Sequence, residues 1–197
     1  MSLVERHYRL LLVSSGDKFI REAGALLQSD QYQTEKSSSA SDARCKLLEN
    51  AYDIVIVNAP LSDESGSRLC IDASQNNGTI AALLSANDSY AEVYAKASVH
   101  GVFVIQKPTS KTLLSQALSL MICARERLRT AEKKADKAQS RLDSIRIVNK
   151  AKWLLIENEG MSEAEAHKHV ERAAMDAGIT KKLAAQLITG SCSAVFR

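Results

Sequence analysis

The sequence predicts an α/β domain with a doubly wound, five-stranded parallel sheet, followed by a long helix and a small all-α module. Three patterns support this order: apolar runs that alternate with amphipathic stretches, a heptad repeat after them, and glycine-terminated helical segments near the end. With 197 residues, 45% of them hydrophobic and 25% charged, the chain suits one medium domain and one smaller one.

The strands are expected at the apolar runs of the α/β domain. Runs rich in Val, Ile and Leu are typical of strands buried on both faces, and four of them lie at 9–13, 53–57, 79–84 and 102–105. The second strand is expected at 32–37, where the apolar pattern is weakest. Helical patterns lie between the strands, at 17–29, 40–50, 66–75 and 88–99. Alternation of this kind predicts a parallel sheet with helices on both sides.

A heptad repeat predicts that residues 114–145 form a coiled-coil dimerisation helix. One series of seam positions comprises Leu114, Met121, Leu128, Ala135 and Leu142, and Asn149 continues it. The other comprises Ala117, Ala124, Ala131, Ala138 and Ile145. No Pro or Gly interrupts 109–159, so we expect one long helix that pairs with a copy of itself. The alternative is a lone helix folded back on the α/β domain, but polar residues between 125 and 146 leave a narrow apolar seam for that.

Residues 146 to 189 are expected to form three helices. Gly160 ends the first helix, Ser162 and Glu165 form a capping-box pattern at the start of the second, and Gly178 ends it. Thr180 can cap the third helix. The second helix has a small-residue face, which we expect to pack against Leu154, Leu155, Leu183 and Leu187.

Residues 8 to about 122 resemble the receiver domain of bacterial two-component response regulators, because Ser85 follows the fourth strand and Lys107-Pro108 follows the last. The resemblance implies a flavodoxin-like strand order 2-1-3-4-5, an acidic pair after the first strand that holds a divalent cation, and a phosphoryl-accepting Asp after the third. Here those positions hold Ser14-Ser15 and Asn58. Since an amide is a poor nucleophile and two hydroxyls cannot replace two carboxylates around Mg²⁺, residues 1–122 are predicted to form a pseudo-receiver.

No catalytic or metal-binding residue is assigned in this domain. Asp17, Asp63 and Glu64 are near enough in sequence to be metal ligands, but we interpret them as helix-start or loop carboxylates. Ser85 and Lys107 are remnants of the family's pocket. They have either a structural role or a place in a site for a different small ligand at the carboxyl ends of the strands.

The C-terminal module, expected over residues 146–197, is similar to the ANTAR domain of transcription antitermination regulators. The resemblance rests on Ala151-Lys152, Leu155, the turn from Gly160 to Ala166, and the run from Arg172 to Asp176. Members of this family bind nascent RNA as dimers and stabilise a paired-hairpin antiterminator. Two residues depart from the pattern: Trp153, where a small residue is usual, and Lys181, where an apolar residue commonly opens the last helix.

Charge supports an RNA partner. Residues 1–124 have a net charge of −2 and residues 125–197 one of +5, so the basic excess lies in the C-terminal part. The cations expected to contact RNA are Lys152, Lys168, Arg172, Lys181 and Lys182. We therefore predict a dimeric regulator that binds a two-hairpin leader transcript and that a sensor or sequestering protein could control.

Other classes of protein fit less well. Four separated cysteines indicate neither a zinc site nor a disulfide framework, His167 and His169 point in different directions on a helix, and no apolar run is long enough for a bilayer. We expect a cytoplasmic, non-enzymatic protein without a cofactor. The alternatives are a protein-interaction adaptor without direct RNA binding and, less well supported, a DNA-binding protein, because no helix start has the Arg, Asn and Gln density that reads bases.

Overall fold

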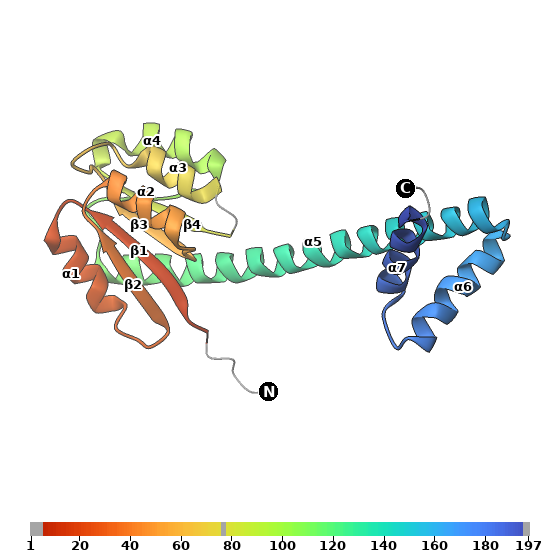
Figure 1. Ribbon diagram of the computed structural model, residues 1–197. Coiled ribbons are helices and arrows are strands. Elements are labelled where there is room, and N and C mark those ends of the chain that lie inside the picture. The colour runs from red at the N-terminus through yellow and green to blue at the C-terminus, as the bar shows by residue number, and fades with distance from the viewer. Residues whose placement is uncertain (1–5, 76–77, 195–197) are drawn as a thin grey trace. The chain divides into compact units, whose positions relative to one another are not determined.

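The computed structural model describes residues 6–75 and 78–194, and the chain divides into two compact units, Met1–Ala131 and Glu132–Arg197 (Figure 1). The first unit contains a parallel five-stranded sheet in the order β2-β1-β3-β4-β5, which confirms the predicted fold. Its strands are β1 (Tyr8–Ser14), β2 (Tyr32–Ser37), β3 (Ile54–Asn58), β4 (Ile80–Ser85) and β5 (Phe103–Gln106).

Helices cover both faces of this sheet (Figure 1). One face packs against α2 (Ala40–Glu49), α3 (Ser67–Gln75) and α4 (Tyr90–Ala97). The other packs against α1 (Asp17–Leu26) and the beginning of α5 (Lys111–Glu159). Along β1, Leu11 and Val13 face the first layer while Leu10 and Leu12 face the second, because successive side chains of a strand alternate. Near-continuous apolar runs are therefore required in the central strands.

The beginning of α5 supplies core residues to the first unit. Leu114, Leu118 and Met121 are buried against the sheet, and Ala117 and Ala124 pack beside them. Leu114 and Met121 are thus occupied within the protomer and are not available to a second helix. This corrects their placement in the coiled-coil seam: the doubly wound sheet needs a helix over this face, and α5 supplies it.

A cluster of charges holds α5 at the other end of the sheet. Asp53, just before β3, accepts hydrogen bonds from Arg125 Nε at 2.9 Å and from Arg129 Nη2 at 2.8 Å. Its second oxygen accepts from the Arg9 backbone N–H at 3.0 Å. The Arg125 guanidinium also lies against Gly78, where an added Cβ would come within 2.8 Å of it. A side chain at Gly78 would require the Arg125 guanidinium to move, and the φ of +84° at this position itself favours glycine.

The second unit contains the end of α5, α6 (Glu163–Asp176) and α7 (Lys181–Ala194). The predicted capping box is present: the Ser162 hydroxyl accepts from the Glu165 backbone, and the Glu165 carboxylate accepts from the Ser162 backbone. Gly160 and Gly178 have φ values of +65° and +64°, the left-handed conformation expected where the helices end.

The core of the second unit is small and tightly packed. It is formed by Ala151, Leu155, Ala166, Val170 and Ala185. The prediction that Leu183 and Leu187 join this core is wrong, since they are 44% and 59% exposed. α7 instead packs through Ala184, Ala185 and Ile188, because small side chains allow its backbone to approach α6 closely.

Candidate functional site

The carboxyl ends of β1, β3 and β5 bring three predicted pocket residues into one hydrogen-bonded chain. Lys107 Nζ donates to Asn58 Oδ1 at 3.1 Å and also to the Ala59 carbonyl. Asn58 Nδ2 donates to Ser14 Oγ at 3.0 Å, and that hydroxyl donates to the Gly16 carbonyl at 3.1 Å. Burial lowers the pKa of Lys107, since desolvation disfavours its charged form. The amide of Asn58 therefore bridges a lysine and a hydroxyl.

Ser85 and Ser15 have separate partners. Ser85 is buried at the end of β4, and its hydroxyl lies 3.0 Å from that of Ser89. Ser15 is exposed and donates to the Pro60 carbonyl at 3.3 Å. These contacts fit the structural role considered for Ser85.

The nearby carboxylates stabilise helices and loops. Asp63 accepts from the backbone N–H groups of Ala40 and Ser41, both at 2.9 Å, and these bonds lower the pKa of Asp63 to about 2. Glu64 pairs with Arg44 at 2.9 Å. Among residues 6–75 and 78–194, no three His, Cys, Asp or Glu side chains form a group that could hold a metal ion.

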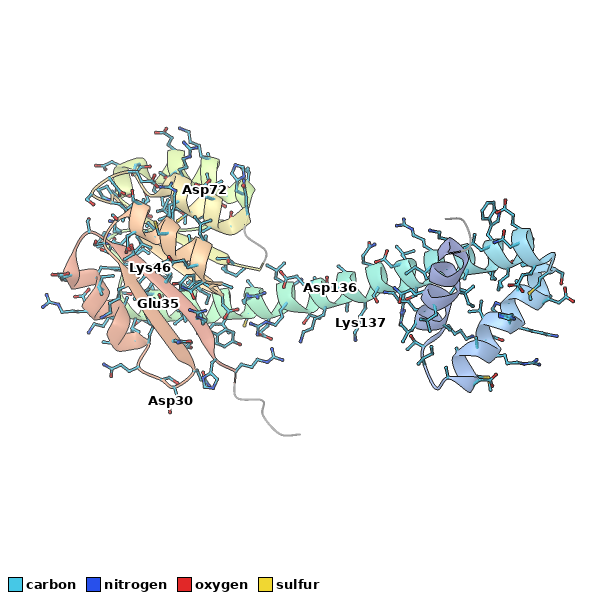
Figure 2. The ribbon with its side chains drawn as sticks, viewed as in Figure 1. Asp30, Glu35, Lys46, Asp72, Asp136 and Lys137 are labelled. Carbon is cyan, nitrogen blue, oxygen red and sulfur yellow. The ribbon has the colours of Figure 1, made fainter. Side chains whose placement is uncertain are left out.

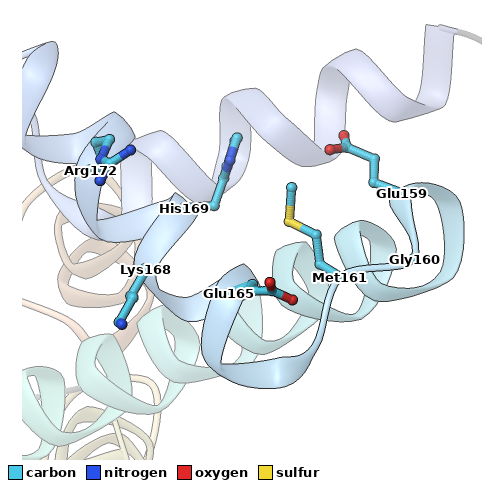
Figure 3. Close-up of a pocket in the computed structure, with 7 residues that line it drawn as sticks. All are labelled: Glu159, Gly160, Met161, Glu165, Lys168, His169 and Arg172. Atoms are coloured by element: carbon cyan, nitrogen blue, oxygen red, sulfur yellow. The ribbon is translucent and has the colours of Figure 1, made fainter.

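Two predicted RNA-binding cations meet at the junction of α5 and α6. A hollow of about 450 Å³ is lined there by Glu159, Gly160, Met161, Glu165, Lys168, His169 and Arg172 (Figure 3). Lys168 and Arg172 are exposed and lie one turn apart on α6. Met161 and His169 were not predicted as site residues. Their only sequence signal was proximity to the Gly160 turn and to Lys168, which does not reveal that they share a hollow.

The other three predicted cations gather around a second hollow. It has a volume of about 420 Å³, and Lys152, Lys181 and Lys182 are among its lining residues. Lys152 pairs with Glu163 at 3.2 Å and Lys181 pairs with Glu171. The Lys181 ammonium is the main cause of the lowered pKa of Glu171. The five cations thus form two groups, and the charges of Lys152 and Lys181 are neutralised by carboxylates.

The remaining seam positions lie on an open stretch of α5. Leu128 is 37% exposed and Leu142 is 51% exposed, with Ala135 exposed between them. Figure 2 shows Asp136 and Lys137 extending from this part of the helix. The described chain has no helix that is both long and apolar enough to cross a membrane.

Each of the two units is similar to known proteins. The ANTAR domain family matches residues 136–188. The chain is 23% identical over 182 residues to the transcriptional regulatory protein PdtaR of Mycobacterium tuberculosis, a similarity that covers 91% of this chain and 89% of that protein.

Solved structures resemble the first unit. The signal receiver domain of an HD domain-containing protein from Pseudomonas fluorescens Pf-5 is 26% identical, with a TM-score of 0.58, over 66% of this chain and 97% of that domain. A structure described as adenylate cyclase from Rhodopirellula baltica has a TM-score of 0.61 at 15% identity, over 66% of this chain and 98% of that one, which shows the fold alone. The chain therefore has a receiver fold followed by a region that matches the ANTAR domain family, and these findings together support an ANTAR response regulator.

Proposed function

We propose that this transcription antitermination regulator acts as a dimer that binds a two-hairpin leader RNA, and that its receiver domain works without phosphorylation. The observation that carries the proposal is the ANTAR domain itself, which places Lys168 and Arg172 together on an exposed face of α6. Cationic side chains line both hollows of the module, so binding of a polyanion is its expected activity. Nascent RNA is the expected partner, which favours a cytoplasmic location.

RNA contact is assigned first to Lys168 and Arg172. Both are exposed, and Met161 and His169 offer a thioether and a planar ring beside them, surfaces on which an unstacked base can rest. Lys152, Lys181 and Lys182 are retained as further contacts. Lys152 and Lys181 are paired with Glu163 and Glu171, and they must share or break these ion pairs to bind a phosphate. Each is therefore expected to contribute less to RNA affinity than Lys168 or Arg172.

The receiver pocket supports signalling without a phosphoryl group. Asn58 has no carboxylate to accept one, and it already bonds Lys107 and Ser14. Ser14-Ser15 cannot supply the two negative charges that a Mg²⁺ site needs. We infer that the domain supports the RNA module or responds to a sensor or sequestering protein.

The seam proposed for the dimer runs along the open part of α5. It comprises Leu128, Ala131, Ala135, Ala138, Leu142, Ile145 and Asn149. Apolar residues at alternating spacings of three and four are typical of a two-stranded coiled coil, and Asn149 provides a polar position of the kind that selects register. A dimer presents two RNA modules, which suits two hairpins.

The test is binding of the full chain to a pool of two-hairpin RNAs with randomised loops. Single-hairpin RNAs and duplex DNA provide the comparison. Lys168→Ala and Arg172→Ala should each weaken binding and reduce the slope of log affinity against log salt by roughly 0.7 to 0.9, the value for one lost phosphate contact. Lys137→Ala, on the exposed stretch of α5, is the matched control and should leave the slope unchanged.

The second candidate is a protein-interaction adaptor, which the ion pairs of Lys152 and Lys181 favour because they reduce the free positive charge of the module. Equal affinity for one hairpin and two would contradict the antiterminator. Binding that survives replacement of all five predicted cations by Ala would contradict it too, and the adaptor would then be preferred.

A further inference from the structure

The only tryptophan of the chain lies on the surface of the second unit. Trp153 projects from α5 and is 61% exposed, although a tryptophan buries more apolar area than any other side chain when it is covered. Tryptophan is enriched at the centres of protein interfaces. An indole held open on a regular helix therefore suggests a partner surface.

An apolar hollow lies on another side of the same helix. This hollow, the α5 groove, has a volume of about 420 Å³, enough for an indole, and Ile145 and Val148 contribute its apolar wall. Lys152, Lys181 and Lys182 stand among its polar lining. Its lining residues on α5 are Ser144, Ile145, Val148, Asn149 and Lys152. Ile145 and Asn149 also belong to the proposed seam, so groove and seam are continuous.

Helical geometry places Trp153 and the groove on opposite flanks of the seam. With Leu142 and Asn149 at position a of the heptad and Ile145 at d, Val148 occupies g and Trp153 occupies e. At about 100° per residue, e and g lie on either side of the a and d positions. In a parallel two-stranded coiled coil, a g residue faces the partner's e residue of the next heptad. Val148 and Trp153 have this relation.

We propose that Trp153 of each copy sits in the α5 groove of the other copy. The inference rests on the proposed dimer and deepens it, since it specifies parallel, in-register helices. An antiparallel pair would bring e against e and leave both grooves open. Lys152 and Lys181 at the groove are already paired with Glu163 and Glu171, so the contact we propose for the indole is the apolar wall of Ile145 and Val148.

The experiment is a dilution series of the full chain in which dimerisation and Trp153 emission are measured on the same samples. Sedimentation gives the dimer fraction, and emission with iodide quenching reports on the single indole. The dimer should show emission at shorter wavelength and weaker quenching than the monomer. Trp153→Ala should raise the dimer Kd by about tenfold or more, as is typical for a buried interface tryptophan. Met175→Ala, which removes an 80% exposed apolar side chain from α6, should leave the Kd unchanged.

The outcomes separate the inference from the proposed function. A dimer whose Trp153 stays exposed and quenchable overturns the groove assignment and leaves the dimer standing. A chain that sediments as a monomer throughout overturns both. Trp153 emission could also stay constant as the dimer fraction changes and be quenched by two-hairpin RNA. That result would assign the indole to base stacking and would also overturn the inference.

Discussion

Removal of the Asp53 carboxylate should loosen α5 from the receiver sheet. Asp53 accepts from Arg125 at 2.9 Å and from Arg129 at 2.8 Å, and the Asp53 and Arg125 side chains are only 14% and 13% exposed. Breaking a buried ion pair costs about 3–5 kcal/mol, whereas an exposed pair contributes about 0–1 kcal/mol. Arg129 is 26% exposed and keeps its ion pair with Glu126, so it loses only part of its stabilisation when Asp53 is removed. We therefore expect Asp53→Ala to cost about 3 kcal/mol, at the lower end of the buried range.

Hydrogen exchange of the full chain measures this cost locally. Amides in the part of α5 that covers the sheet, residues 114–131, should lose protection equivalent to about 3 kcal/mol, while those of α6 provide an internal reference. Asp136→Ala removes an exposed carboxylate from the same helix and should change protection by less than about 0.5 kcal/mol. A loss below about 1 kcal/mol for Asp53→Ala would refute the argument, because it would place the pair in the range of surface salt bridges.

Three further predictions concern the pocket, the dimer and acid stability. Because Asn58 has no carboxylate, incubation with a phosphodonor and Mg²⁺ should leave the mass of the chain unchanged, and a stable acyl phosphate would contradict the pseudo-receiver. Leu142→Asp should dissociate the dimer in sedimentation, since it places charge in the seam, whereas Lys137→Ala should not. The folded pKa of Asp63, about 2, lies below the unfolded value of about 3.9, so its stabilisation is complete above about pH 4 and is lost as the pH falls towards 2. In Asp63→Asn, the urea concentration at the unfolding midpoint should depend less on pH in that window. An unchanged dependence would mean that other carboxylates cause the acid sensitivity.

Much of the fold could be predicted because local patterns and tertiary structure agree. The apolar runs became β1, β3, β4 and β5, and even the weakly patterned second strand formed where expected, at Tyr32–Ser37. The Ser162 and Glu165 capping box and the glycine at each helix end depend on neighbouring residues alone, so they too were readable. The role of Asp63 as a helix-start carboxylate was also anticipated, although the helix it stabilises is α2, which lies earlier in the chain.

The incorrect predictions concern apolar residues whose spacing does not show which surface they pack against. Leu114 and Met121 keep the heptad spacing of Leu128, yet they pack on the sheet, because a helix buries an apolar stripe equally well against its own domain or another chain. Leu183 and Leu187 are apolar and one turn apart, but the close approach of α7 depends on Ala184 and Ala185 instead.

Residue type and short-range spacing were enough to predict the order of elements, the parallel sheet, the helix ends and the position of Asn58 at the end of a strand. Tertiary packing was needed to show that Lys107, Asn58 and Ser14 form one hydrogen-bonded chain, and that Asp53 binds Arg125 and Arg129. Those contacts join residues more than 40 positions apart, and their distances are set by how strands and helices pack rather than by any local preference.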